Sequence, residues 1–326
     1  MVDVNGFYDS AENVSSYFDQ VDLFIAGVSG EERYARGFSV LNQKGLIPGK
    51  KILFYFNEVL ANFTEADYDR DFALAANDYK LRLNLYDEMN GLFDFRRYMD
   101  SNPEEFQNKN IVVDFTVLVK PYFFLLMKHL LNIRPKRMAL IYTEPDKYAS
   151  LTRGAVANRD IPGYSGSQDL TKKDALAILL GFEGNRANSL YGEIQPDLTI
   201  PINGFPSFKP EFKDESILKN RELLTSEEIF KKMRFAPAND PFETKDVLNE
   251  LYDALKADYN LTIAPLGSKP MALGSCFFAL EHPECRVVYP YPQEYLPKAS
   301  LGWNNSWLYI TEIKDALAEG NQCAQV

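Results

Sequence analysis

The feature that most constrains this chain is a pattern that occurs twice along it. Three positions match at an offset of 147 residues: Tyr142 with Tyr289, Pro145 with Pro292, and Tyr148 with Tyr295. A second set matches at an offset of 149 residues: Lys120 with Lys269, Pro121 with Pro270, and Arg137 with Arg286. Because a repeat of this kind dictates the architecture, these two sets favour two copies of one fold. Chance resemblance at a few positions is the alternative.

A third match lies upstream, where two strand-like runs each end in Gly-x-x-Gly with an arginine just beyond. The first is Phe-Ile-Ala-Gly-Val-Ser-Gly-Glu-Glu-Arg at residues 24–33, and the second is Ile-Leu-Leu-Gly-Phe-Glu-Gly-Asn-Arg at residues 178–186. Gly27 and Lys120 are 93 residues apart, and Gly181 and Lys269 are 88 apart. This similar spacing is what a duplication predicts.

Short apolar runs alternate with longer helical patterns in both halves of the chain. Continuous apolar runs suit a sheet covered on both faces, and strand–helix alternation implies parallel pairing. A chain of 326 residues also exceeds what one core usually supports. The sequence therefore predicts an α/β protein with two tandem Rossmann-like domains and mainly parallel sheets, at residues 1–150 and 176–326. Residues 151–175, rich in Gly, Ser and Pro, are expected to form a linker or mobile loop.

The expected strands cover residues 22–27, 51–56, 110–115 and 137–142 in the first copy and 177–182, 198–202, 261–264 and 286–289 in the second. Residues 306–313 are expected to form a final edge strand. The expected helices cover residues 31–41, 73–89 and 121–131, then 186–194, 216–224, 245–257 and 271–281.

Composition disfavours several classes of function. A formal net charge of −11 argues against a partner of duplex nucleic acid, because duplex binding relies on Lys and Arg at the phosphates. Three cysteines and two histidines far apart in sequence argue against a disulfide framework or a zinc site, and no metal or other cofactor is expected. The polar, acidic N-terminus and the lack of an apolar run of about 18 residues predict a cytoplasmic protein without a membrane partner.

Four loops carry residues suited to holding an anion. In open parallel sheets, ligands bind beyond the carboxyl ends of the strands, where helix N-termini present free backbone N–H groups. The residues expected to bind a nucleotide or other phosphate-bearing small ligand are Gly27, Ser29, Gly30, Arg33, Thr116, Lys120, Gly181, Gly184, Arg186, Gly267, Ser268 and Lys269. A purely structural role in tight strand-to-helix turns is the alternative for the same residues.

None of these loops is a Walker A, and no Gly-x-Gly-x-x-Gly fingerprint occurs. The candidates for acid–base or charge-stabilising chemistry are Asp114, Glu183 and Lys269. Asp114, at the end of a strand, equally suits a helix N-cap. Three aromatic residues near the end of the chain either stack on a nucleobase or cover the core: Trp303, Trp307 and Tyr309.

Residues 265–274, Pro-Leu-Gly-Ser-Lys-Pro-Met-Ala-Leu-Gly, lie between a strand-like run and an apolar helical pattern. This segment resembles the Thr-Gly-Gly-Thr-Lys-x-Met type of loop in CARF domains, the Rossmann-like sensors of CRISPR-associated bacterial defence. The segment Ile-Val-Val-Asp-Phe-Thr at 111–116, followed by Lys120, is a fainter version of the same element. Pro265 and Leu266 stand where the family pattern has Thr-Gly, and the first copy has no glycine pair.

The resemblance implies binding of cyclic oligoadenylates or related nucleotides across a two-fold axis, in some members with slow cleavage of the ring. It implies phosphate contacts for Gly267, Ser268 and Lys269, and it places the loop at residues 27–30 on the same cleft. The leading hypothesis is a nucleotide-sensing protein of bacterial antiviral defence that acts through a separate effector protein. An enzyme that hydrolyses or transfers a nucleotide or phosphoester is one alternative, and a scaffold without a small ligand is another.

Overall fold

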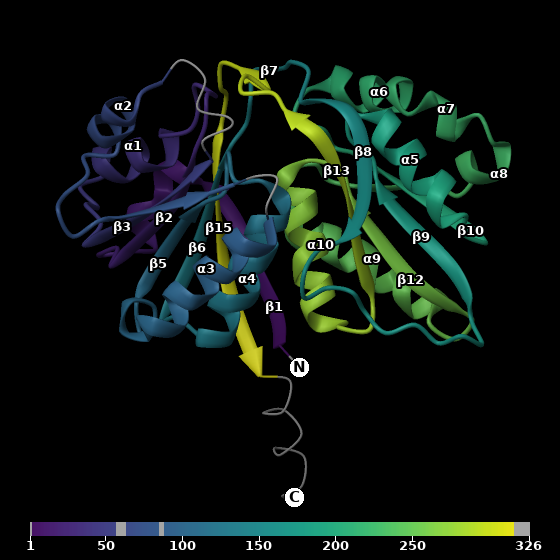
Figure 1. Cartoon of the computed structure of the whole chain (residues 1–326), viewed down its shortest axis with the longest axis horizontal. Helices are drawn as coiled ribbons and strands as arrows, with labels where there is room; N and C mark the ends of the chain where they lie inside the picture. The colour runs from purple at the N-terminus through teal and green to yellow at the C-terminus, as the bar shows by residue number, and fades with distance from the viewer. Residues whose placement is uncertain (1, 57–62, 85–87, 316–326) are drawn as a thin grey trace, which may run out of the picture. The chain divides into compact units, whose positions relative to one another are not determined.

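The computed structural model describes residues 2–56, 63–84 and 88–315 of the chain (Figure 1). It confirms an α/β architecture with two sheets of mostly parallel strands interleaved with helices. The chain divides into two compact units, each built on one sheet. The seven-stranded unit comprises Asn5–Arg153 and Glu294–Ile313. The six-stranded unit comprises the described parts of Met1–Val4, Gly154–Gln293 and Lys314–Val326.

The seven-stranded sheet has the order β1-β15-β6-β5-β2-β3-β4. Its strands are β1 (Val2–Ser10), β2 (Leu23–Val28), β3 (Lys50–Phe56), β4 (Tyr79–Leu83), β5 (Asn110–Asp114), β6 (Arg137–Thr143) and β15 (Ser306–Asp315). Strands β2 to β6 pair in parallel, and β15 runs antiparallel to β6. Two short strands, β7 (Lys147–Tyr148) and β14 (Ser300–Leu301), form a separate antiparallel pair.

Side chains of the central strands point alternately to the two faces of this sheet, and helices cover both faces. Leu53 and Tyr55 of β3 belong to the apolar cluster that contains helices α1 (Arg36–Gln43) and α2 (Glu65–Asp71). Phe54 and Phe56 point to the other face, where they contact Phe95 of α3 (Glu88–Ser101) and Tyr122 of α4 (Lys120–Ile133). Because successive side chains of a strand point to opposite faces, β3 contacts α1 and α2 on one face of the sheet and α3 and α4 on the other.

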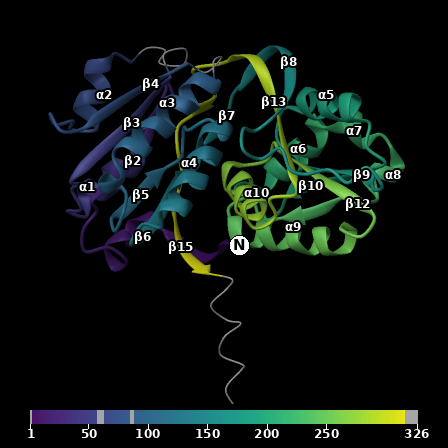
Figure 2. The same ribbon diagram turned by 60° about the horizontal axis from the view of Figure 1, so that its bottom comes forward.

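The six-stranded sheet has the order β11-β10-β9-β12-β13-β8. Its strands are β8 (Thr152–Asp160), β9 (Lys173–Leu179), β10 (Leu198–Gly204), β11 (Arg234–Ala236), β12 (Tyr259–Pro265) and β13 (Arg286–Tyr295). One face packs against α5 (Gly184–Ile194), α6 (Pro210–Lys219), α7 (Arg221–Leu224) and α8 (Glu227–Phe230). The other face packs against α9 (Pro241–Leu255) and α10 (Lys269–Glu281), and Figure 2 shows the two layers on opposite sides of the sheet.

The five parallel strands of each sheet follow one spatial order, third-second-first-fourth-fifth along the chain. In one sheet this order is β4-β3-β2-β5-β6, and in the other it is β11-β10-β9-β12-β13. It is the strand order of a Rossmann-like fold, in which the direction of winding reverses between the first and fourth strands. Duplication predicts this agreement, although duplication itself stays a prediction.

The structure differs from the sequence-based expectations at several segments. The helix expected at 73–89 is wrong, because the described part contains β4, whose residues Tyr79, Leu81 and Leu83 alternate as in a strand; residues 85–87 lie outside the described chain. The segment 151–175, expected as a linker or mobile loop, contains β8. The expected edge strand at 306–313 is β15, which lies between β1 and β6, and its central residues Leu308 and Tyr309 are fully buried.

No helix in the described part of the chain is long and apolar enough to cross a membrane.

Candidate functional site

The four loops chosen from the sequence follow the strands at which the winding reverses. Two loops follow β2 and β5 in the seven-stranded unit, and two follow β9 and β12 in the six-stranded unit. In each pair the neighbouring strands are parallel, so both loops leave the same edge of the sheet. Open α/β sheets bind their ligands at this position. The loops therefore occupy the place in each unit where a ligand site is expected on topological grounds.

The glycines of these loops allow the two loops of each pair to approach closely. A Cβ at Gly27 would lie 2.9 Å from Leu118 Cδ2 in the loop after β5. A Cβ at Gly181 would overlap the carbonyl oxygen of Leu266 in the loop after β12. Close packing of the neighbouring loop thus explains both glycines without any ligand. Gly184 has a similar reason, because a Cβ there would overlap the carbonyl oxygen of Lys219.

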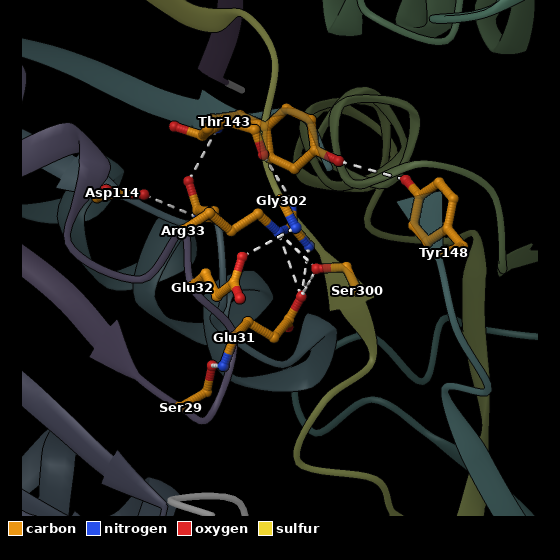
Figure 3. Close-up of polar contacts among 11 residues, drawn as sticks. Ser29, Glu31, Glu32, Arg33, Asp114, Thr143, Tyr148, Ser300 and Gly302 are labelled. Carbon is orange, nitrogen blue, oxygen red and sulfur yellow. Dashed lines mark hydrogen bonds and ion pairs between the residues drawn. The ribbon is translucent and has the colours of Figure 1, made fainter. Parts of the chain in front are cut away.

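Arg33 lies inside the seven-stranded unit, where its guanidinium joins three parts of the chain (Figure 3). It forms an ion pair of 2.9 Å with Glu31, and its Nη1 donates to the carbonyl oxygen of Thr143 at 2.6 Å. Its Nε donates to Ser300 Oγ at 3.1 Å, and Ser300 in turn donates to Glu31. Burial alone would lower the pKa of Arg33, but Glu31 together with Tyr142 and Tyr148 outweighs burial, and the pKa is raised. The guanidinium is therefore a charged internal brace between the loop after β2 and the end of β6.

Arg186 has the same arrangement in the six-stranded unit. Its Nη1 forms an ion pair of 2.6 Å with Glu183, and its Nε and Nη2 donate to the carbonyl oxygen of Pro290 at 3.0 and 2.6 Å. The guanidinium carbon lies 4.7 Å from the ring centroid of Tyr289, as that of Arg33 lies 5.6 Å from Tyr142. Arg33 and Arg186 thus tie equivalent loops to the fifth parallel strands, at Thr143 where β6 ends and at Pro290 within β13.

Asp114 and Thr116 connect the loops after β2, β5 and β6 through backbone groups. The Asp114 carboxylate accepts the N–H of Gly37 at 3.1 Å and that of Thr116 at 2.9 Å. Thr116 Oγ1 accepts the N–H of Thr143 at 2.9 Å. Asp114 and Thr116 are both buried. Asp114 is therefore not the N-cap of the helix that follows it, which is Val119; its carboxylate accepts one N–H at the start of α1 and one in its own loop.

The two lysine–proline pairs begin equivalent helices. Lys120 and Pro121 are the first residues of α4, and Lys269 and Pro270 are the first residues of α10, so each pair follows the fourth parallel strand of its unit. Proline suits the first helical turn because its missing N–H has no partner there in any case. Both lysines are half-buried, and they lie where the sequence placed the anion-binding loops.

The remaining predicted residues hold their loops in shape. Ser268 is the N-cap of α10, since its Oγ accepts the N–H of Met271 at 3.2 Å, and its hydroxyl donates to the carbonyl oxygen of Ala238. A Cβ at Gly267 would lie 3.0 Å from Met271 Sδ. Ser29 Oγ accepts the N–H of Glu31 at 3.2 Å, and the neighbouring Gly30 is buried.

The sequence analysis did not predict that residues 300–303 belong to this edge, because their partners are far away along the chain. Residues 300–303 lie against the loop after β2: besides the Ser300 contacts, the N–H of Gly302 donates to Glu32 Oε2 at 3.1 Å. The Trp303 ring lies 5.0 Å from the guanidinium carbon of Arg36, the first residue of α1. Tyr309, by contrast, belongs to the buried core, as one of the two sequence interpretations proposed.

The acid–base candidates are engaged with other groups of the chain. Asp114 is held by two backbone N–H groups, and Glu183 is paired with Arg186. Across residues 2–56, 63–84 and 88–315, no group of three or more His, Cys, Asp or Glu side chains is placed to hold a metal ion.

Comparison with known proteins finds similarity to solved structures. No protein-family model matches the sequence, and no curated protein matches it. A solved structure described as a "Type III CRISPR defence DNA nuclease activated by cyclic oligoadenylate" is similar to this chain with a TM-score of 0.50 and 11% sequence identity. The match covers 83% of this chain and 65% of the nuclease, slightly less than two thirds of its length. At this identity the similarity shows a shared fold.

Proposed function

We propose that this protein is a nucleotide sensor of CARF-like type, and that it holds phosphate at the loop formed by Gly267, Ser268 and Lys269. The observation that carries the proposal is the position of a lysine as the first residue of α10, with its equivalent Lys120 as the first residue of α4. Both lysines lie beside the strands between which the winding reverses.

A lysine at the start of a helix is electrostatically unfavourable on its own. The N-terminal end of a helix carries roughly half a positive charge, so a cation there costs about 0.3–1 kcal/mol. An anion bound beside the lysine at this end of the helix reverses the sign of this interaction. Lysine stands at this position in both units, which supports a function in anion binding.

The other basic residues predicted from the sequence have a supporting role in this proposal. Arg33 and Arg186 donate to carbonyl oxygens within their own units and are buried. They fix the loops after β2 and β9, against which the phosphate-binding loops pack. The proposed phosphate contacts are therefore Lys269, Ser268 and Gly267 in one unit and Lys120 in the other.

Three further parts of the proposal depend on resemblance. The loop at 265–274 resembles that of CARF domains, and the nuclease with a similar fold is described as activated by cyclic oligoadenylate. From these we infer a role in bacterial antiviral defence, a cyclic or linear oligonucleotide as ligand, and an effector protein as partner.

The test is thermal unfolding in the presence of cyclic and linear oligoadenylates and mononucleotides. A nucleotide at one hundred times its dissociation constant stabilises the folded protein by about 2.7 kcal/mol, which raises the melting temperature by several degrees. Lys269→Ala is expected to abolish this shift. The matched control is Lys173→Ala, which removes an exposed lysine at the amino end of β9, on the opposite edge of the same sheet.

The same experiment separates the alternatives. Product analysis after incubation with a stabilising nucleotide distinguishes a sensor from an enzyme. If no nucleotide shifts the transition, the scaffold interpretation replaces the sensor. If a nucleotide shifts it but Lys173→Ala and Lys269→Ala behave alike, the nucleotide does not bind through Lys269 and the proposed phosphate loop is wrong.

A further inference from the structure

Two large aromatic side chains are exposed at the carboxyl end of strand β10. Phe205 directly follows β10 and has 52% of its surface exposed; Phe235, in the edge strand β11, has 47% exposed. Their ring centroids lie 6.1 Å apart with an interplanar angle of 73°. Exposed apolar residues are common singly, but two in edge-to-face contact form a surface that packs well against a third ring.

This aromatic pair is linked directly to the proposed phosphate loop. The N–H of Phe205 donates to the carbonyl oxygen of Ala236 at 2.8 Å. The N–H of Ala238 donates to the carbonyl oxygen of Pro206, also at 2.8 Å. Ser268, the N-cap of α10, donates to the carbonyl oxygen of the same Ala238. One residue therefore bridges the segment that carries Phe205 and the loop that carries Lys269. The three segments form one continuous edge of the six-stranded unit.

A second lysine lies over the Phe205 ring. Lys213 of α6 has its Nζ 5.3 Å from the ring centroid, and its side chain is 35% exposed. A cation at an aromatic face is attracted by the ring, which favours one position for a long, flexible side chain. Lys213 Nζ also lies 3.6 Å from the Asp214 carboxylate, so the edge combines an exposed aromatic surface with an ion pair beside it.

We propose that Phe205, supported by Phe235, is the platform on which the base of a bound nucleotide stacks, while the loop at 267–269 holds its phosphate. This inference rests on the proposed function and narrows its ligand: the protein recognises a nucleotide with an accessible base, and a phosphate group alone binds weakly. Stacking on an aromatic side chain is tolerant of base identity, because every base presents a flat aromatic face. Selectivity among bases then comes from other contacts.

The test compares AMP and a cyclic oligoadenylate with ribose 5-phosphate, which has no base. By isothermal titration, Phe205→Ala is expected to weaken binding of both nucleotides roughly 5- to 150-fold, as loss of one stacked base predicts, and to leave ribose 5-phosphate binding unchanged. Phe205→Tyr is expected to retain nucleotide binding. The matched control is Phe230→Ala, since Phe230 is 50% exposed on α8 of the same unit.

A spectroscopic signal reports stacking itself. A nucleotide with 2-aminopurine in place of adenine is expected to lose fluorescence on binding to the parent protein, because stacking quenches this base, and to lose much less with Phe205→Ala. Unfolding curves of each variant show that it is folded.

Three outcomes overturn the inference, and they are distinguishable. If Lys269→Ala weakens nucleotide binding and Phe205→Ala does not, the base platform is wrong and the sensor proposal stands. If Phe205→Ala weakens ribose 5-phosphate as much as AMP, Phe205 acts by shaping the loop and the platform is again wrong. If the parent protein binds neither nucleotide, both proposals fall together.

Discussion

Gly37 shows how a single residue holds two loops of the candidate site together. Its N–H donates to Asp114, and a Cβ at this position would overlap the Asp114 carboxylate. Gly37→Ala is therefore expected to displace Asp114 and to lower the free energy of unfolding by about 2–4 kcal/mol. Urea unfolding measures this change.

A second glycine provides the control. Gly192 lies in α5, with no atom of another part of the chain within 4 Å of the position its Cβ would take. Gly192→Ala is expected to raise the free energy of unfolding by roughly 0.5–1 kcal/mol, because alanine is the better helix former. Equal effects at the two glycines would show that the contact between Gly37 and Asp114 contributes little.

His129 is expected to make the stability of the protein depend on pH. Burial, aided by Arg96, lowers the pKa of this half-buried side chain of α4 below its usual 6.5. The unfolded chain then binds a proton at higher pH than the folded chain, so stability is full above pH 6.5 and falls as the pH drops toward the lowered pKa. His129→Gln is expected to flatten the slope of unfolding free energy just below pH 6.5. An unchanged slope would assign it to other groups.

At the scale of elements, burial decides which strands the sequence reveals. The central strands β2, β5, β9 and β12 are continuous apolar runs and were predicted within a few residues. In the two large sheets, the four strands that were missed, β1, β4, β8 and β11, are the edge strands; the short separate pair β7 and β14 was missed as well. An edge strand has one neighbour and more exposure, so its sequence carries polar and charged residues and loses the apolar signal.

The position of the candidate site could be predicted from the sequence, because its loops follow buried central strands. Loops after central strands are recognisable, and the four that were chosen lie at the points where the winding reverses. The role of each side chain was not predictable, because it depends on partners far away in sequence. The partners of Arg33, at Thr143 and Ser300, are more than one hundred residues distant.

Helix α10 gives a prediction about its own first residue. Since a cation opposes the helix dipole at this end, Lys269→Ala is expected to leave the ligand-free protein as stable as the parent or more stable, by up to about 1 kcal/mol. Lys219, the last residue of α6, is the control, because a cation favours that end and Lys219→Ala should destabilise slightly. A loss of more than about 1 kcal/mol in urea unfolding of Lys269→Ala would make Lys269 a structural residue.

Across the whole molecule, the two units share more topology than sequence. The five parallel strands have the same order in both units, and Arg33 and Arg186 each donate to a carbonyl oxygen of the fifth strand. The lysine–proline pairs begin equivalent helices. The loops themselves differ: residues 300–303 lie against the loop after β2, whereas Arg186, just after the loop that follows β9, is bonded to Pro290. We infer that equivalent positions in the two units do not have equivalent functions.

The chain also passes between the two units within its strands. Residues 2–4 of β1 belong to the six-stranded unit, and the rest of β1 belongs to the other sheet. Buried charges hold these first residues in place. Lys245 of α9 donates to the carbonyl oxygen of Val4 at 2.9 Å, and Glu281 of α10 accepts the N–H of Val4 at 2.9 Å. Lys245 and Glu281 also form an ion pair of 2.9 Å.

Removal of residues 1–4 is therefore expected to destabilise α9 and α10, although these helices lie more than 230 residues away in sequence. Loss of Val4 leaves buried polar groups of Lys245 and Glu281 without their backbone partner, which costs about 1–3 kcal/mol. Amide hydrogen exchange in α9 and α10 should become roughly 10- to 100-fold faster, while exchange in β2 and β5 stays unchanged. Asp3→Asn is the control, because the Asp3 side chain is 41% exposed and its contact with Lys245 contributes little. If exchange in α9 and α10 is the same with and without these residues, the buried ion pair alone stabilises the two helices, and β1 stabilises only the seven-stranded sheet.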